Sequence, residues 1–354
     1  MTRLLRNPKT LLFLIIALSV FLVSLGGGAL GNAFNGGFLG SPIAHIQLPA
    51  ESVLTDPLIG NFYLTNTMLA TWLTIAILLV LSLVATRKVS IIPGRLQNLF
   101  EVLLEFFLNL MESIAGPENA RKFFPLVMTI FLFILAANWV GILPGFATIG
   151  RFEPGDEVIH HAEVKAEKEH SHLNLDEVQL QVFDGNNGVA ILPFGSIESV
   201  ITGREFEEHG VDSDRRAGLL VPFLRSSNTD VNTTLAIAIV AMLMVHYWGL
   251  TSLGIFGHLG KFLNFKGGPI GFAVGILEAI GEVARLISFT FRLFGNIFAG
   301  EVLLAAMAFL LPLIGIIPFL GLELFVGAIQ AFIFAMLTLV FASLATISHN
   351  SEEH

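Results

Sequence analysis

Ionisable and amide side chains interrupt two of the most apolar segments of this chain. Charged residues in hydrocarbon cost about 2.5–3.5 kcal/mol each on insertion scales, so those present are candidates for function. Arginine keeps its proton at any accessible pH, whereas a carboxyl group whose pKa is raised by burial can take up and release protons. The combination predicts a proton path with a fixed-charge gate. Its candidate members are Glu278, Glu282, Arg285, Arg292, Asn296, Glu301, Glu323 and Gln330.

Helical geometry places most of these residues on one stripe. At about 100° per residue, five of them fall within roughly 80° of each other. Small residues continue the stripe and would allow another helix to approach closely. Glu301 points about 140° away from Glu278 on the same wheel. The stripe consists of Glu278, Glu282, Arg285, Arg292 and Asn296, followed by Ala299 and Gly300.

A purely structural interpretation stays open for part of this set. Glu282 and Arg285 could neutralise one another at i and i+3, and Glu278 could join them. Glu301 and Glu323 could be protonated packing residues. Arg292 differs, because no acidic residue lies three or four positions from it. Its partner must therefore come from another element.

The composition indicates a membrane protein. The 354 residues are 54% hydrophobic and only 13% charged, with a mean hydropathy of +0.77, whereas soluble domains carry about a quarter charged residues. The absence of cysteine excludes disulfides, thiolate metal sites and cysteine nucleophiles. A net charge of −9 argues against a nucleic-acid partner.

We expect an all-α integral membrane protein with about five transmembrane helices and two long, strongly tilted C-terminal helices. A hydrocarbon core about 30 Å thick needs about 20 apolar residues. The stretch 270–307 holds some 35 helical residues, about 52 Å, so it must tilt, bend or break. A further N-terminal segment, 11–25, is a signal peptide or an anchor. The expected spans are 68–85, 123–142, 235–253, 270–307 and 319–347.

Positive residues predict the orientation of these spans. Basic residues cluster after the second apolar segment, before the third and after the fourth, which places those connectors and the C-terminus in the cytoplasm. Arg225 is a lone basic residue on the outer side. Residues 97–113 have acidic residues at helical spacing and predict an amphipathic helix at the cytoplasmic interface. The alternative is a span whose acids face protein.

A soluble insert carries the whole net charge. Residues 151–216 hold 15 acidic and 6 basic residues. Two β-like runs, 178–183 and 189–194, flank a turn and predict a small hairpin. A zinc site and plain solvation are both open for the insert's histidines, which are His160, His161, His170, His172 and His209. We divide the chain into regions 1–30, 31–148, 149–223 and 224–354.

The residues around Arg292 resemble a known family. The stretch Ile287-Ser-Phe-Thr-Phe-Arg-Leu-Phe-Gly-Asn-Ile-Phe-Ala-Gly-Glu301 is similar to the signature of subunit a of F-type ATP synthases. The resemblance covers about residues 61–148 and 224–345. Further matching stretches are 65–67, 92–97, Asn138 with Leu143 and Pro144, 229–235 and 330–334.

The resemblance implies a proton-channel stator subunit that is not itself an enzyme and needs no cofactor. Its implied partners are the c-ring proteolipids, the peripheral-stalk b subunits, the rest of the complex and the lipid bilayer, in a bacterial plasma (inner) membrane. Arg292 falls on the arginine that faces the c-ring carboxylates. Some relatives carry histidine at the Glu323 position. The N-terminal segment and the acidic insert are additions. Asn296, Glu301, Glu323 and Gln330 fall on the extracytoplasmic half-channel, and Glu278 and Arg285 on the cytoplasmic side.

Two other classes of protein compete with this interpretation. A secondary ion transporter with a midplane acid–base site would show inverted repeats and broken helices in matching halves. No such repeat is visible, and the charges gather in one C-terminal region. An intramembrane enzyme would need a catalytic motif such as His-Glu-x-x-His, which the chain lacks. The phosphate-binding Gly-x-x-x-x-Gly-Lys loop is also absent.

Overall fold

The computed structural model describes residues 8–27, 49–54, 57–58, 60, 62–87, 94–147, 149–168, 172–184, 189–191, 197–211, 215–262, 268–311 and 314–347. The chain divides into two compact units. The first comprises Met1–Leu69, Ile142–Arg225 and Phe298–Leu324, and the second comprises Ala70–Gly141, Ser226–Ile297 and Phe325–His354.

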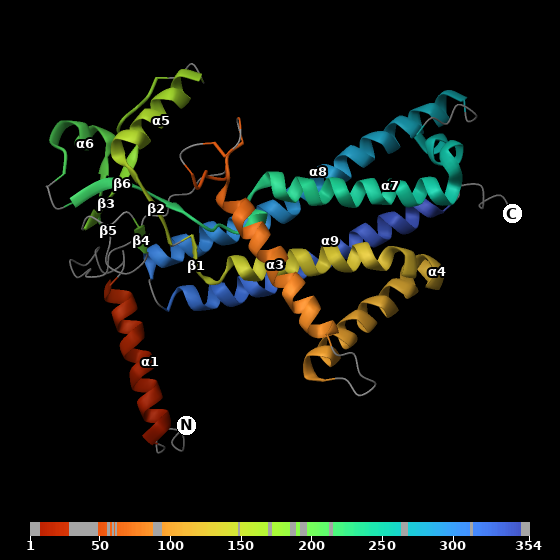
Figure 1. The fold of residues 1–354 in the computed structure, drawn as a ribbon, viewed down its shortest axis with the longest axis horizontal. Coiled ribbons are helices and arrows are strands. Elements are labelled where there is room, and N and C mark those ends of the chain that lie inside the picture. The colour runs from red at the N-terminus through yellow and green to blue at the C-terminus, as the bar shows by residue number, and fades with distance from the viewer. Residues whose placement is uncertain are drawn as a thin grey trace. The chain divides into compact units, whose positions relative to one another are not determined.

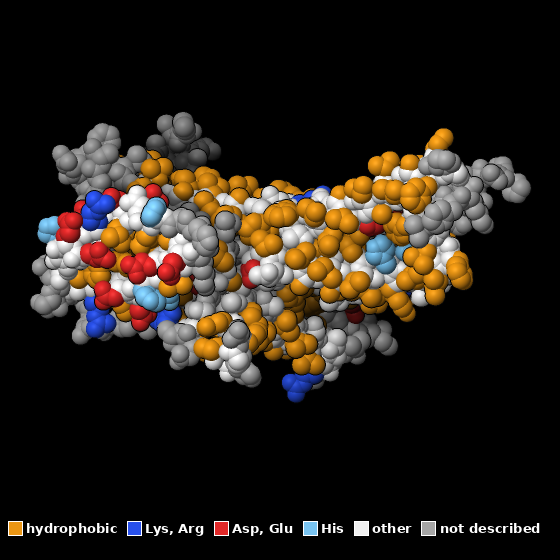
Figure 2. Space-filling view, turned by 90° about the horizontal axis from the view of Figure 1, so that it is seen from above, with side chains coloured by type: hydrophobic (Ala, Val, Ile, Leu, Met, Phe, Trp, Pro, Cys, Tyr) orange, Lys and Arg blue, Asp and Glu red, His pale blue; other side chains and the backbone are white. Residues whose placement is uncertain are grey.

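The expected membrane helices are present, and the all-α integral membrane class is confirmed. Five helices in the described residues are long and apolar enough to cross a membrane (Figure 1). Large apolar side chains such as Phe325, which is 64% exposed, cover their outer faces (Figure 2). The predicted N-terminal segment is also a helix, α1 (Pro8–Gly27). The five are α3 (Asn66–Thr86), α4 (Arg95–Gly141), α7 (Val231–Phe262), α8 (Gly268–Leu310) and α9 (Ile316–Thr346).

Glycines break two of these helices. Gly116 in α4 has φ 75° and ψ 162°, and Gly254 in α7 has φ 71° and ψ 167°. This region of backbone space is essentially restricted to glycine. Pro117 follows the first break, at the start of a new helical arm, where a missing N–H costs nothing.

The first arm of α4 is the predicted amphipathic helix. Phe107 and Met111 are buried in the hydrophobic core, whereas Glu101 and Glu105 are exposed. Glu112 is half-buried and lies 3.7 Å from Nε of Arg121. The interfacial location of this arm therefore stays a prediction, as does the alternative of a span whose acids face protein. By contrast, α8 runs unbroken for 43 residues, about 64 Å. The helix α8 therefore does not accommodate its excess length by breaking. Its tilt in the membrane stays a prediction.

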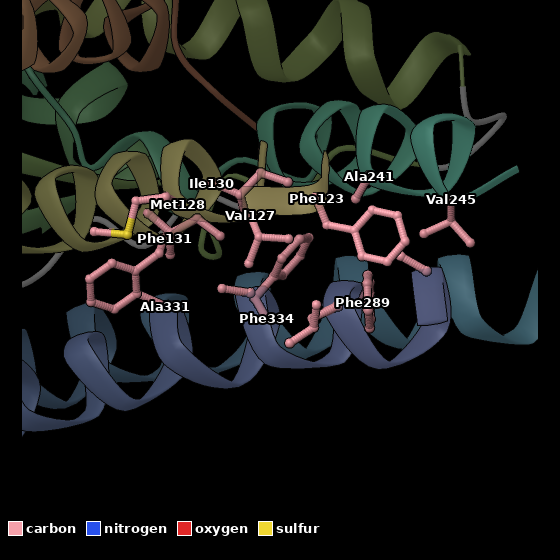
Figure 3. Packing of buried hydrophobic residues seen from close by; sticks show 14 of the residues in the cluster. Phe123, Val127, Met128, Ile130, Phe131, Ala241, Val245, Phe289, Ala331 and Phe334 are labelled. Atoms are coloured by element: carbon pink, nitrogen blue, oxygen red, sulfur yellow. The ribbon is translucent and has the colours of Figure 1, made fainter. Parts of the chain in front are cut away.

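The core of the second unit is a continuous apolar cluster drawn from α4, α7, α8 and α9. Aromatic rings dominate it: Phe289 of α8 lies 4.7 Å from Phe334 of α9 between ring centroids, and Phe123 of α4 lies 4.5 Å from Trp248 of α7. Figure 3 shows the α4 side chains Phe123 and Val127 packed between these helices. This packing holds one face of α8 against the core as far as Leu293, which is buried.

The acidic insert folds as an antiparallel sheet within the first unit, which corrects the predicted hairpin. The strand order is β4-β2-β6-β3-β5, so the two predicted strands are not neighbours. Alternation of side chains identifies strands but does not choose their partners. The helices α5 (Gly155–Lys168) and α6 (Gly203–His209) and the strand β1 (Pro144–Ala147) accompany the sheet. Its strands are β2 (Ile149–Pro154), β3 (Gln179–Asp184), β4 (Val189–Ile191), β5 (Ile197–Thr202) and β6 (Arg215–Pro222).

Charged side chains gather on the surface of the insert (Figure 2). His161 pairs with Glu153, with 2.8 Å between Nδ1 and Oε1, and Arg204 pairs with Asp176 at 3.0 Å. Among the residues that the structure describes, no three His, Asp or Glu side chains gather as a metal site. His170, part of the zinc hypothesis, lies outside the described residues.

Candidate functional site

Arg292 lies on α8 without an acidic partner in the described part of the chain. Its side chain is half-buried, and Nη2 donates a hydrogen bond to Oγ of Ser288 at 3.1 Å. The next residue, Leu293, is buried in the core, which anchors the helix. The preceding Phe291 is 56% exposed. The guanidinium therefore stands at the edge between the packed core and an open apolar face.

Small side chains make that open face of α8 approachable. Ala284, Ser288, Asn296 and Ala299 are all exposed. A Cβ atom added at Gly295 would meet nothing within 4 Å. Small residues on a membrane helix let a second helix come close to the backbone. Only part of the predicted stripe is therefore uncovered: Asn296 and Ala299 are exposed, whereas Gly300 lies against Glu323 and Oε2 of Glu282 is buried.

On the N-terminal half of α8, the predicted structural pairing is present. Arg285 Nη1 donates to Oε1 of Glu282, and the Arg285 guanidinium carbon lies 4.7 Å from the ring centroid of Phe341 on α9. Glu278 is half-buried and joins no ion pair among the described residues. Glu278 therefore does not belong to the neutralised pair, in contrast to one of the alternatives from the sequence.

Two histidines of α7 extend this pair, and they were missed in the sequence. Nδ1 of His246 lies 3.3 Å from Nε2 of His258. Nε2 of His246 lies 3.9 Å from Oε2 of Glu282. The available signal was His246, an ionisable ring within the expected span 235–253, whereas His258 lies beyond that span.

A buried amide chain supports α9 just before Gln330. Asn228 Nδ2 donates to Oδ1 of Asn138 at 2.7 Å, and Asn138 Nδ2 donates to the carbonyl of Gly327 at 3.0 Å. Both asparagines are fully buried. Gln330, one helical turn further, is half-buried. The amide chain holds this turn of α9 by directional bonds rather than by apolar contact alone.

In the first unit, Glu301 forms a two-pronged ion pair with Arg225. Nε of Arg225 donates to both carboxylate oxygens at 3.1 and 3.2 Å, and Nη2 donates to Oε2 at 3.1 Å. Arg225 is only 5% exposed, and its Nη1 also donates to the carbonyl of Pro49 at 3.4 Å. Arg225, the lone basic residue expected on the outer side, is thus the partner of Glu301, a predicted member of the proton path.

Two further carboxyl groups belong to the same unit as this ion pair. Glu51 accepts a hydrogen bond from Nδ2 of Asn66 at 3.3 Å. Burial raises the pKa of Glu51 from 4.5 to about 7, against the lowering effect of Arg225 and with further increases from Glu153 and Glu301. Glu323 of α9 lies against Gly300 of α8, where an added Cβ would overlap its carboxylate.

The structure thus brings together some of the predicted site residues and adds others. Glu301 and Glu323 share the first unit, and Arg292, Asn296, Gln330, Glu278 and Arg285 lie in the second. The residues that sequence reasoning missed are Glu51, Arg225 as a partner, His246 and His258.

Comparison with known proteins gives this arrangement a family. The family model described as ATP synthase A chain matches residues 68–343. A protein of Desulforamulus reducens named ATP synthase subunit a is 27% identical over 299 residues, covering 82% of each chain. One of the same name from Gloeobacter violaceus is 28% identical over 285 residues, covering 80% of this chain and 85% of its own. With Arg292, Glu301 and Glu323 all inside the matched span, the chain belongs to the ATP synthase A chain family.

Proposed function

We propose that this chain is the non-catalytic stator subunit that guides protons to and from a rotating c-ring, with Arg292 as the gate. One observation carries the proposal. Arg292 is a half-buried cation on a membrane helix, it has no acidic partner among the described residues, and it borders an open face of small side chains. A buried cation needs a counter-charge, and a rotor carboxylate passing along that face would supply one.

On the uptake side, the proposed path begins at the extracytoplasmic surface with Glu323 and Glu301. Glu323 has no bonded arginine among the described residues and is the proton carrier in this proposal. Glu301, held by three hydrogen bonds from Arg225, orients the path rather than carrying the proton through it. Asn296 and Gln330 orient water or carboxyl groups without titrating.

On the release side, a rotor carboxyl meets Arg292 after its turn through lipid. The guanidinium favours the ionised carboxylate, so the proton leaves. Glu278 and Arg285 then line the exit toward the cytoplasm. Glu278, free of an ion pair in the described residues, is the acceptor in this step, and Arg285 is positioned by Glu282 and Phe341.

The energetics require a partner that makes ATP. A membrane potential of 100 mV supplies about 2.3 kcal/mol for each charge moved, so several protons must be collected for each ATP. This chain has no phosphate-binding loop. In this proposal it works with the c-ring proteolipids, the peripheral-stalk b subunits and a soluble ATPase, in a bacterial inner membrane with its C-terminus in the cytoplasm.

The test is the Arg292→Ala variant in inverted membrane vesicles that contain the assembled complex. We expect ATP-driven proton pumping to fall to background, because nothing then separates the two half-paths or removes the rotor proton. ATP hydrolysis by the soluble sector should persist. Arg204→Ala, which removes an insert arginine paired with Asp176, is the matched control and should pump normally. Normal pumping by Arg292→Ala would refute the gate.

A further inference from the structure

The break at Gly254 creates a histidine pair that a straight helix would not contain. His246 and His258 are 12 residues apart on α7, a distance of about 18 Å along a continuous helix. The positive φ of Gly254 turns the last part of α7 back, and the two ring nitrogens come within 3.3 Å. The ring of His258 lies on Gly249, where any added Cβ would meet it. His258 is 5% exposed.

The pair faces a carboxylate with one unused oxygen. Oε1 of Glu282 accepts the hydrogen bond from Arg285, whereas Oε2 is buried and accepts none within the described chain. That second oxygen is the one 3.9 Å from Nε2 of His246. The charged and titratable groups around His246 in the described residues are thus His258 on its own helix and Glu282 and Arg285 on α8. The ring of Phe262 also borders both histidines.

This arrangement has the chemistry of a relay. A neutral imidazole accepts a proton at one nitrogen and releases one from the other. Two imidazoles at hydrogen-bond distance share one additional proton. Arg285 bonds only Oε1 of Glu282, whereas Arg225 bonds both oxygens of Glu301. Glu282 therefore keeps one oxygen without a donor in the described chain, where a proton in transit can bind briefly.

We propose that Glu282, His246 and His258 form a proton relay on the cytoplasmic side of Arg292. A proton on Oε2 of Glu282 passes to Nε2 of His246, and Nδ1 of His246 gives its proton to Nε2 of His258. Nδ1 of His258 is buried beside Gly249, so it releases its proton toward the cytoplasm when the arm after Gly254 moves away. Both rings then carry their proton on Nε2, and each must rotate about its Cβ–Cγ bond before the next proton can pass. Because 3.9 Å exceeds hydrogen-bond length, the first step occurs when the carboxylate turns toward the ring. The relay deepens the proposed function and rests on it.

The experiment uses the assembled complex in inverted vesicles, whose outer face is the cytoplasmic one. We expect His246→Gln and His258→Gln each to lower proton pumping about tenfold or more at neutral cytoplasmic pH, since a positioned acid–base group is lost. Imidazole added outside the vesicles should restore much of the flux in both variants and leave the wild type unchanged. His209→Gln, at the end of α6 in the insert, is the matched control and should behave as wild type.

Rescue by imidazole separates a relay from a packing role. An assembled variant whose loss of pumping imidazole does not reverse would overturn the relay, as would unchanged pumping by both variants. If His246→Gln does not assemble, His258→Gln and His258→Asn decide the matter by the same rescue. If the histidine variants refute the relay while Arg292→Ala still abolishes pumping, the proposed function stands without the relay. If Arg292→Ala pumps normally, both the relay and the proposed function are refuted.

Discussion

At the scale of single residues, Arg225 and Glu301 are stable only as a pair. Arg225 is almost fully buried and Glu301 is about a quarter exposed. Taking charges out of water is costly, and the three hydrogen bonds at 3.1–3.2 Å offset part of that cost. Removing one partner leaves the other charge buried and unpaired. The pair therefore serves geometry as well as stability, because it holds the carboxylate in one orientation.

Arg225→Met is expected to destabilise the chain by about 3–5 kcal/mol, because it strands the Glu301 carboxylate. The measurement is the thermal-unfolding midpoint of the purified complex, followed through subunit dissociation. The double variant Arg225→Met with Glu301→Gln is the control and should regain most of the loss, since no buried charge remains. Equal midpoints for wild type and Arg225→Met would show that the pair contributes little.

Glu51 predicts a pH dependence with a definite sign. Its pKa is raised by burial from 4.5 to about 7 in the folded chain, so the folded state holds more protons than the unfolded state between these values. Its contribution to stability is complete below pH 4.5 and is lost as pH rises through about 7. Glu51→Gln keeps a neutral, hydrogen-bonding side chain there at every pH.

The measurement for Glu51 is the unfolding midpoint from about pH 5 to about pH 8. The wild-type midpoint should fall relative to that of Glu51→Gln as pH increases, and the two should converge at the acid end. Asp176→Asn, which changes an exposed acid in the insert, is the control. A parallel course of the wild-type and Glu51→Gln curves would place the Glu51 carboxyl in ordinary solvent.

At the scale of elements, Gly300 of α8 leaves room for the carboxylate of Glu323 on α9. An alanine Cβ there would overlap the carboxylate, so Gly300→Ala must push Glu323 out of its position. We expect a several-fold loss of proton flux with little loss of stability, because a flexible side-chain end can move away. Gly321→Ala on α9, where an added Cβ meets nothing within 4 Å, should keep wild-type flux. Equal flux in both variants would remove Glu323 from the path.

The sequence predicted helices far better than strands. Each membrane helix can be predicted from the hydropathy of its own residues, because the hydrocarbon thickness sets the length of the apolar stretch. The arm before Gly116 is helical as its spacing of acids predicted, with Glu101 and Glu105 exposed, and its place at the membrane interface stays a prediction. The runs β3 and β4 were also recognised as strands, but their partners are β6 and β2. Those partners are chosen by tertiary packing, which local alternation does not encode.

At the scale of the whole molecule, the insert joins the membrane part through a narrow pair of strands. Phe223 N donates to the carbonyl of Ile149 at 3.0 Å, and Ala147 N donates to that of Leu224 at 2.8 Å. Arg151 and Val221 are register partners in this pair. The insert also has its own apolar clusters, such as Ile159 with Leu180 and Ala217. It can therefore fold around its own core.

Replacement of residues 152–220 by Asn-Gly should leave a closed hairpin between Arg151 and Val221, because this dipeptide favours the turn that joins antiparallel strands. We expect the shortened chain to assemble and pump protons at close to the wild-type rate. The measurements are co-purification of the complex and ATP-driven pumping. A second variant with Gly-Ser-Gly-Ser-Gly at the same junction controls for turn strain. If both variants assemble without pumping, the insert takes part in proton transfer.

The candidate site was predictable only where one helix carried the information. Arg292 stood out because no acid lies one turn away, and the structure keeps it unpaired within the described chain. The Arg225–Glu301 pair joins residues 76 positions apart, and Glu51 approaches from a loop before α3. The histidine pair depends on a backbone break at Gly254. None of these three follows from spacing on a regular helix, because each requires the chain to fold back on itself.

One bond to Ser288 uses a single N–H of the Arg292 guanidinium, which has five. In hydrocarbon, a donor without an acceptor costs several kcal/mol. A copy that has not yet met its rotor therefore keeps donors that assembly would satisfy, so docking of the ring would lower the free energy of this helix as well as complete the gate.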